Sequence, residues 1–315
     1  MRRTSLALSL VLPVLSFAAA PPGIPDGWSD GYAYANGVRI HYYRAVPASG
    51  KPVMVMVHGV TDIGLSWTTL TLELQDDYDI YMLDARAHGL SDPFTASDDG
   101  DTLVKDVVAF VQSMGLDRPI LMGHSMGAAT VMRVGAEYPD LAQAIIMLDP
   151  GVGGGPPPEP PKAGADSAAA SPEREASAPQ ELSVSMRGTP ETLVTQNNYN
   201  FADLVARCGR NTPKWDLVDC QYWALSKKQY HGPYTEAAWQ AMYGTMRTAE
   251  SLANIPVPAL ILKADAPAQT RQVHQAAAGV MRNGRLVHID GAGHNLHHDE
   301  LARTVEVLND FLSTL

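Results

Sequence analysis

A Gly-x-Ser-x-Gly pentapeptide, residues 123–127, constrains this chain more than any other feature of its sequence. It stands directly after the apolar run 119–122 and directly before the helix-like stretch 128–138. In such a strand, sharp turn and helix, the serine protrudes on a strained elbow, and glycines flank it because larger side chains would collide with the neighbouring strand and helix. The pattern predicts that Ser125 is a nucleophile.

A serine nucleophile needs two partners further along the chain, because its hydroxyl reacts poorly at neutral pH without a base and a group that fixes the tautomer of that base. His294 follows the strand-like stretch 285–289 and is the candidate base. Asp265, after the apolar strand 258–262, is the first choice for the acid. Asp149, at the end of the preceding strand, is the alternative acid. The predicted triad is therefore Ser125, Asp265 and His294, with Asp149 as the rival.

An oxyanion hole is expected beside the serine. The apolar strand 53–57 ends in a His-Gly-Val turn, where Gly59 lets the backbone bend so that the N–H of Val60 faces the nucleophile. The N–H of Met126 supplies the second donor. The residues around this turn are expected to border the substrate pocket: His58, Gly59, Asp62 and Trp67.

Short apolar strands alternate with helical patterns along the chain. A hairpin through Ala35-Asn36-Gly37 begins an antiparallel part of the sheet. Continuous apolar strands separated by helices indicate a parallel sheet covered on both sides. The fold class is α/β, with a mostly parallel, doubly wound sheet of about eight strands. The expected strands are 32–34, 38–44, 53–57, 79–83, 119–122, 144–148, 258–262 and 285–289.

These motifs together resemble the alpha/beta-hydrolase family, from about Gly31 to Leu315 with one interruption. Besides the elbow, the likeness includes the His-Gly turn at 58–59, the segment Asp-Ala-Arg-Ala-His-Gly-Leu-Ser at 84–91 and the Gly-x-Gly-His sequence that ends at His294. Ala87 stands where relatives usually have glycine. Relatives often carry the acid three residues beyond a glycine after the seventh strand, and residues 263–265 have neither that glycine nor that spacing.

The interruption divides the expected hydrolase core into residues 21–150 and 252–315. Residues 151–180 are rich in Gly, Pro, Ala, Ser and Glu and are expected to be a flexible linker, because they cannot bury enough apolar surface to fold alone. Residues 181–251 regain helical character and aromatic side chains. The resemblance implies that this segment is a helical cap that shapes the substrate pocket.

The chain has two cysteines, Cys208 and Cys220, both within the expected cap. In an oxidising compartment they are expected to form one disulfide, with a pair of free thiols as the alternative. His297 and His298 lie close to His294 in the sequence, but no further ligand pattern accompanies them, so no metal is expected. The chemistry of the predicted triad requires no cofactor.

Residues 1–20 have the pattern of a secretory signal peptide: two arginines, an apolar stretch too short to span a bilayer, and three alanines. We therefore expect a periplasmic or secreted protein without stable membrane insertion. The net charge of −11, from 23 basic and 34 acidic residues, disfavours binding to nucleic acid or anionic lipid. The expected partner is a small-molecule acyl substrate.

The function that these features predict is that of an exported serine hydrolase that cleaves a carboxylic ester or lactone through an acyl-enzyme. Epoxide hydrolases and haloalkane dehalogenases of the resembled family use a carboxylate nucleophile, which a serine cannot replace. Cleavage of a carbon–carbon bond beside a ketone, or of an amide, uses the same triad and stays an alternative. A non-enzymatic ligand-binding protein on this fold is the alternative from another class.

Overall fold

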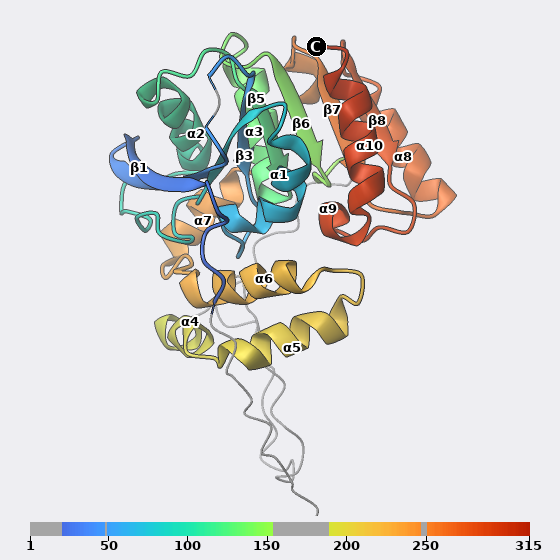
Figure 1. The fold of residues 1–315 in the computed structure, drawn as a ribbon. Coiled ribbons are helices and arrows are strands. Elements are labelled where there is room, and N and C mark those ends of the chain that lie inside the picture. The colour runs from blue at the N-terminus through green and yellow to red at the C-terminus, as the bar shows by residue number, and fades with distance from the viewer. Residues whose placement is uncertain (1–20, 48, 154–188, 247–250) are drawn as a thin grey trace, which may run out of the picture.

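One mixed sheet with helices on both faces forms the body of the protein. The computed structural model describes residues 21–47, 49–153, 189–246 and 251–315. Within them, eight strands lie in the order β1-β2-β4-β3-β5-β6-β7-β8. The β1–β2 and β2–β4 pairs are antiparallel and all other neighbours are parallel. Figure 1 shows the helices that cover the sheet. The predicted fold class is confirmed.

The strands lie close to their expected positions. They are β1 (Ser29–Ala35), β2 (Val38–Arg44), β3 (Val53–Val57), β4 (Asp79–Leu83), β5 (Ile120–His124), β6 (Ala144–Leu148), β7 (Ala259–Lys263) and β8 (Gly284–His288). The predicted hairpin joins β1 to β2. Its two turn residues, Asn36 and Gly37, both have positive φ, at 47° and 82°, as the tight turns that match the twist of a hairpin require.

The helices fall into two groups. Those of the core are α1 (Thr68–Leu74), α2 (Thr102–Ser113), α3 (Met126–Glu137), α8 (Ala268–Ala278), α9 (Leu296–Asp299) and α10 (Leu301–Leu312). Two short 3-10 helices, η1 (Gly64–Trp67) and η2 (Leu252–Asn254), complete this group. The others, α4 (Pro190–Asn197), α5 (Phe201–Asn211), α6 (Leu217–Gln229) and α7 (Glu236–Gly244), form what we call the helical insertion.

The sheet has an apolar layer on each face because successive side chains of a strand point to opposite sides. In β3, Val55 and Val57 belong to a core cluster with α2 and α3. Met54 and Met56, which alternate with them in sequence, belong to the cluster that includes α1 and α10. The central strands are thus buried on both faces, which explains why they are apolar without alternation.

The helical insertion occupies part of the segment 181–251 that was predicted to be helical. Figure 1 shows α4, α5 and α6 as a group on the side toward which the arrowhead of β6 points. Cys208 of α5 and Cys220 of α6 form a disulfide, as predicted. The predicted signal peptide, and the predicted linker from residue 154 onward, lie outside the described residues. No described helix combines the length and apolar character needed to cross a bilayer.

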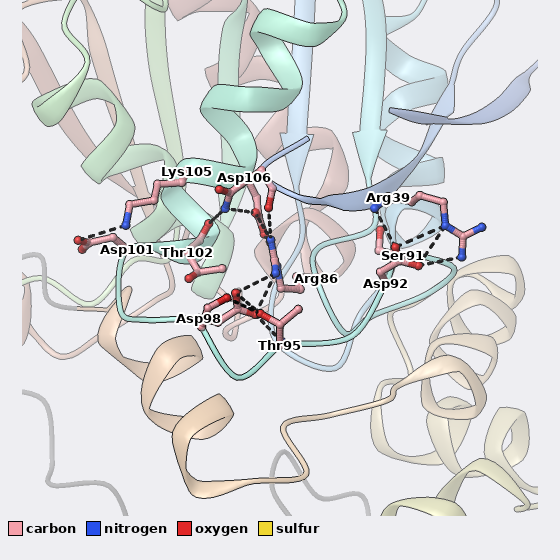
Figure 2. A network of polar contacts seen from close by, with 12 residues as sticks. Arg39, Arg86, Ser91, Asp92, Thr95, Asp98, Asp101, Thr102, Lys105 and Asp106 are labelled. Carbon is pink, nitrogen blue, oxygen red and sulfur yellow. Dashed lines mark hydrogen bonds and ion pairs between the residues drawn. The ribbon is translucent and has the colours of Figure 1, made fainter. Parts of the chain in front are cut away.

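A buried polar network fixes the loop that follows β4 (Figure 2). Arg86 is only 1% exposed, and its guanidinium pairs with Asp98 at 2.9 Å and Asp106 at 2.7 Å. The same side chain donates to the backbone carbonyl of Asn36 at 3.1 Å. A buried cation costs little only when its donors are satisfied in this way. The network therefore anchors the segment 84–91 to α2 and to the first hairpin.

Candidate active site

Ser125 lies on a strained turn between β5 and α3. Its φ of 53° and ψ of −112° are unusual for a residue with a side chain. The turn is pinned because the N–H of Ser125 donates to the carbonyl of Leu148, the last residue of β6, at 2.9 Å. The protein therefore has the elbow geometry that the pentapeptide predicted.

The two glycines of the pentapeptide are required by close backbone contacts. A Cβ on Gly123 would lie 2.2 Å from the carbonyl oxygen of Gly127. A Cβ on Gly127 would lie 2.0 Å from the carbonyl oxygen of Val57, at the end of β3. Neither position has room for a methyl group, because the atoms that it would meet belong to the backbone.

We expect the substitution Gly127→Ala to lower the free energy of unfolding by about 1–3 kcal/mol, the usual cost of overpacking, because strand β3 or helix α3 must shift. Gly209→Ala is the matched control, since Gly209 lies exposed in α5 and a Cβ added there would meet no described atom within 4 Å. That substitution should stabilise the protein by up to about 1 kcal/mol. Urea denaturation measures both. Equal stability of Gly127→Ala and wild type would contradict this account of the elbow.

His294 is paired with Asp149. Its Nδ1 lies 2.5 Å from Oδ2 of Asp149, which follows β6 directly. A proton on Nδ1 is donated to the carboxylate, so the other ring nitrogen, Nε2, is free to accept a proton. The imidazole is 54% exposed, whereas the Asp149 side chain is 10% exposed. The pair has the arrangement of a base and the acid that orients it.

The structure holds the Asp149 carboxylate in its ionised form. Lys263, the last residue of β7, pairs with Oδ1 at 2.5 Å, and the N–H of Ala264 donates to the same oxygen at 3.1 Å. Burial opposes ionisation, but the hydrogen bond with His294 and the charge of Lys263 outweigh it and hold the pKa of Asp149 well below its ordinary value. Asp149 also has a positive φ of 46°, a second strained residue at this edge of the sheet.

The prediction that Asp265 orients His294 is wrong. The Asp265 carboxylate is 45% exposed, accepts the N–H of Gly291 at 3.0 Å and pairs with Arg271 at 2.5 Å. Its own N–H donates to the carbonyl of Ala292 at 2.9 Å. These contacts brace the loop before His294 and turn the carboxylate outward, so the rival acid Asp149 takes the position beside the imidazole.

His124, which precedes Ser125, links the elbow to the histidine loop. Its Nε2 donates to the backbone carbonyl of His294 at 2.9 Å, and the two imidazole rings lie 4.7 Å apart. Burial, reinforced by repulsion from His294, lowers the pKa of His124 to about 4. His124 is therefore neutral at neutral pH and adds no charge beside His294.

The expected oxyanion turn lies against the elbow. A Cβ on Gly59 would lie 3.3 Å from Cβ of Ser125. Within the described residues, the backbone N–H groups of Val60 and Met126 donate no hydrogen bond to the protein. An oxyanion hole requires two such unused donors, and here one follows Ser125 in sequence while the other belongs to the turn that lies against the elbow.

Of the other residues expected at the pocket, His58 and Trp67 are buried and Asp62 is partly exposed. His58 is 1% exposed and accepts the N–H of Ala85 through Nε2 at 3.0 Å. Trp67 is also 1% exposed and packs against the ring of His297 at 4.8 Å. These two side chains present almost no surface to a ligand. Asp62 is partly exposed and pairs with Lys227 of α6 at 3.2 Å.

Sequence reasoning did not identify Lys263, Lys227 or His124 as members of the site. Lys263 carried a signal, because it is a single charge at the end of an otherwise apolar strand. Lys227 carried none, because its partners lie 165 and 166 residues away. No group of three or more His, Cys, Asp or Glu side chains suited to a metal ion occurs in the described part of the chain.

Known hydrolases resemble this chain in sequence. The profile of the alpha/beta hydrolase family matches residues 54–307. N-formylmaleamate deformylase of Pseudomonas putida is 36% identical over 126 residues, which are 39% of this chain and 46% of that protein. Epoxide hydrolase 1 of Caenorhabditis elegans is 28% identical over 127 residues, 40% of this chain and 31% of that protein. The chain thus spans less than half the length of the curated relatives it matches.

Among solved structures, the crystal structure of the N-formylmaleamic acid deformylase of Pseudomonas putida S16 is similar, with a TM-score of 0.64 and 20% identity. The superposition covers 89% of this chain and all of that one. At this identity the likeness concerns the fold. The family profile spans most of the sequence, including both flanks of the helical insertion, and so this chain belongs to the alpha/beta hydrolase family.

Proposed function

We propose that this protein is a serine hydrolase that cleaves a carboxylic ester or lactone through an acyl-enzyme on Ser125. The observation that carries the proposal is the pairing of His294 with Asp149 at the edge of the sheet where the Ser125 elbow protrudes. Ser125 lies between β5 and α3, and Asp149 follows β6 directly, so the sheet positions the nucleophile and the acid.

In the proposed reaction, Nε2 of His294 removes the proton of Ser125 while Oγ attacks the carbonyl carbon. The N–H groups of Val60 and Met126 stabilise the oxyanion that forms, each by ~3 kcal/mol if they resemble measured donors. The imidazolium then protonates the leaving oxygen, and the carbon–oxygen bond breaks. Water activated by His294 attacks the acyl-enzyme and releases the acid.

Amide hydrolysis is the second candidate, and the likeness to N-formylmaleamate deformylase favours it. The same groups act, but His294 protonates a nitrogen in place of an oxygen. The leaving group is therefore the point at which the two candidates differ, and the protein surface that contacts it decides between them.

Reaction with a fluorophosphonate tests the class of enzyme. We expect one phosphonyl group on the tryptic peptide that contains Ser125, because only an activated serine reacts readily. A correctly folded protein that stays unlabelled would support the alternative of a non-enzymatic binding protein. Comparing kcat/KM across p-nitrophenyl acyl esters, lactones and N-formyl amides then separates the two candidate reactions.

Export of the protein is part of the proposal. The disulfide between Cys208 and Cys220 supports it, since such bonds persist in oxidising compartments. The helical insertion is proposed to act as the cap, with a small-molecule acyl substrate between it and the carboxyl ends of the strands. Detection of the mature protein in the periplasm or culture medium checks the location.

A further inference from the structure

Lys227 of α6 reaches from the helical insertion into the turn that carries the proposed oxyanion donor. Its ammonium donates to the carbonyl of Thr61 at 2.9 Å and to the Thr61 hydroxyl at 2.8 Å. It also pairs with the carboxylate of Asp62 at 3.2 Å. The side chain of Lys227 is 2% exposed. A lysine is rarely buried so completely unless its donors are all occupied, as they are here.

The turn that Lys227 holds is strained. Thr61 has a φ of 68°, an outlier for a β-branched residue, which persists only where the surroundings enforce it. From the core, Nε2 of His88 accepts the N–H of Thr61 at 3.1 Å. From the helical insertion, Lys227 holds the carbonyl and hydroxyl of the same residue. Thr61 is therefore fixed between two parts of the chain that are far apart in sequence.

This constraint passes to the peptide between Gly59 and Val60. The N–H of Asp62 donates to the carbonyl of Gly59 at 3.1 Å, and Nδ1 of His58 donates to the same oxygen at 2.7 Å. In a trans peptide the C=O and N–H point in opposite directions, so holding the Gly59 oxygen aims the N–H of Val60. A shift of Asp62 would rotate this peptide.

We propose that Lys227 is a positioning residue that keeps the Val60 N–H aimed at the oxyanion and thereby couples the helical insertion to catalysis. This inference rests on the proposed hydrolase function. Lys227 does not touch the reacting atoms, because its three donors are taken by Thr61 and Asp62. Its contribution should therefore appear in the chemical step and hardly in substrate binding.

The test is the substitution Lys227→Met, which keeps the length and apolar stem but removes the ammonium. We expect kcat for a p-nitrophenyl acyl ester to fall by about 10–100-fold, because misplacing a catalytic donor by ~1 Å costs up to ~10²-fold, while KM changes by less than about threefold. Lys228→Met is the matched control. Lys228 is the next residue of α6 and donates to the carbonyls of Asn197 and Tyr199, both within the helical insertion.

A thionoester substrate distinguishes positioning from a structural role. Its sulfur accepts hydrogen bonds weakly, so it gains less from the oxyanion hole than the matching ester. We expect the ratio of ester to thionoester rates to fall in Lys227→Met and to stay at the wild-type value in Lys228→Met. Loss of rate on both substrates by the same factor, or an unchanged kcat in Lys227→Met, would overturn the inference.

Two further variants keep the test decisive. If Lys227→Met does not fold, as judged by circular dichroism, Lys227→Gln removes the charge with a smaller loss of polarity and is judged by the same ratio. Ser125→Ala reports on the proposed function alone. Turnover retained in Ser125→Ala would reject the serine mechanism itself, whereas loss in Ser125→Ala with an unchanged ratio in the Lys227 variants would reject only the role of Lys227.

Discussion

Replacing Ser125 with alanine is expected to lower kcat for a p-nitrophenyl acyl ester by about 10⁵–10⁶-fold, the scale of loss when the nucleophile of a serine triad is removed. The loss is large because the hydroxyl oxygen forms the bond to the acyl carbon, and water in the same place lacks both the proximity and the activated proton transfer. Stopped-flow or long-time absorbance assays of p-nitrophenol release measure the wild type and the residual rate.

The fold should survive this substitution. The elbow is held by a backbone hydrogen bond from the N–H of Ser125 to the Leu148 carbonyl, and alanine keeps this bond. Ser113→Ala is the matched control, since its hydroxyl donates to the Phe110 carbonyl on α2, away from the elbow. Both variants should unfold within about 1 kcal/mol of wild type. Undiminished ester turnover by Ser125→Ala would remove the serine from the mechanism.

The elbow could be predicted because the residues that form it are neighbours in sequence, although the Val57 carbonyl that excludes a Cβ at Gly127 comes from the distant strand β3. Gly123 and Gly127 flank Ser125 in sequence, and the contacts that exclude a Cβ at these glycines come from the adjoining turn and the nearest strand. The strands could also be predicted, because a strand that is buried on both faces is a short apolar run and can be recognised from its own residues. The hairpin at Asn36 likewise follows from its own turn residues.

The acid could not be chosen in this way because the choice is non-local. Both Asp149 and Asp265 follow a central strand, and both lie at the same edge of the sheet. What separates them is side-chain direction: Lys263 and the Ala264 N–H hold Asp149 inward, whereas Arg271 and the Gly291 N–H hold Asp265 outward. Order along the chain carries no information about these contacts.

Ala87 adopts the backbone conformation that a glycine would have at its position. Relatives usually have glycine at this position, and Ala87 has a φ of 65°, the left-handed conformation that glycine adopts without cost. Its N–H donates to the carbonyl of Asp92 at 3.0 Å, and its own carbonyl accepts the N–H of His231. Hydrogen bonds from neighbouring segments hold the turn in the geometry expected of glycine. The alanine differs from glycine in the conformational strain that this positive φ imposes on it.

Asp149 contacts both His294 and Lys263, so loss of its carboxylate should be costly for catalysis. Asp149→Asn is expected to lower kcat by about 10⁴-fold, as the matching substitution does in a serine protease triad, because an amide can donate to Nδ1 of His294 and favour the wrong tautomer. Asp265→Asn is the matched control at the rival position and should keep the rate within about threefold of wild type, since its exposed carboxylate bonds Arg271 and Gly291 in place of the imidazole.

Steady-state assays on one ester, together with the rate of fluorophosphonate labelling, measure both variants. Labelling should slow in Asp149→Asn, because the tautomer with the proton on Nε2 cannot take the proton of Ser125. Lys263 keeps the Pro150 carbonyl as an acceptor at 2.8 Å in that variant, which limits the structural cost of losing its carboxylate partner. A large loss in Asp265→Asn beside a near-normal Asp149→Asn would show that the histidine loop rearranges during catalysis and that the first sequence prediction describes the working enzyme.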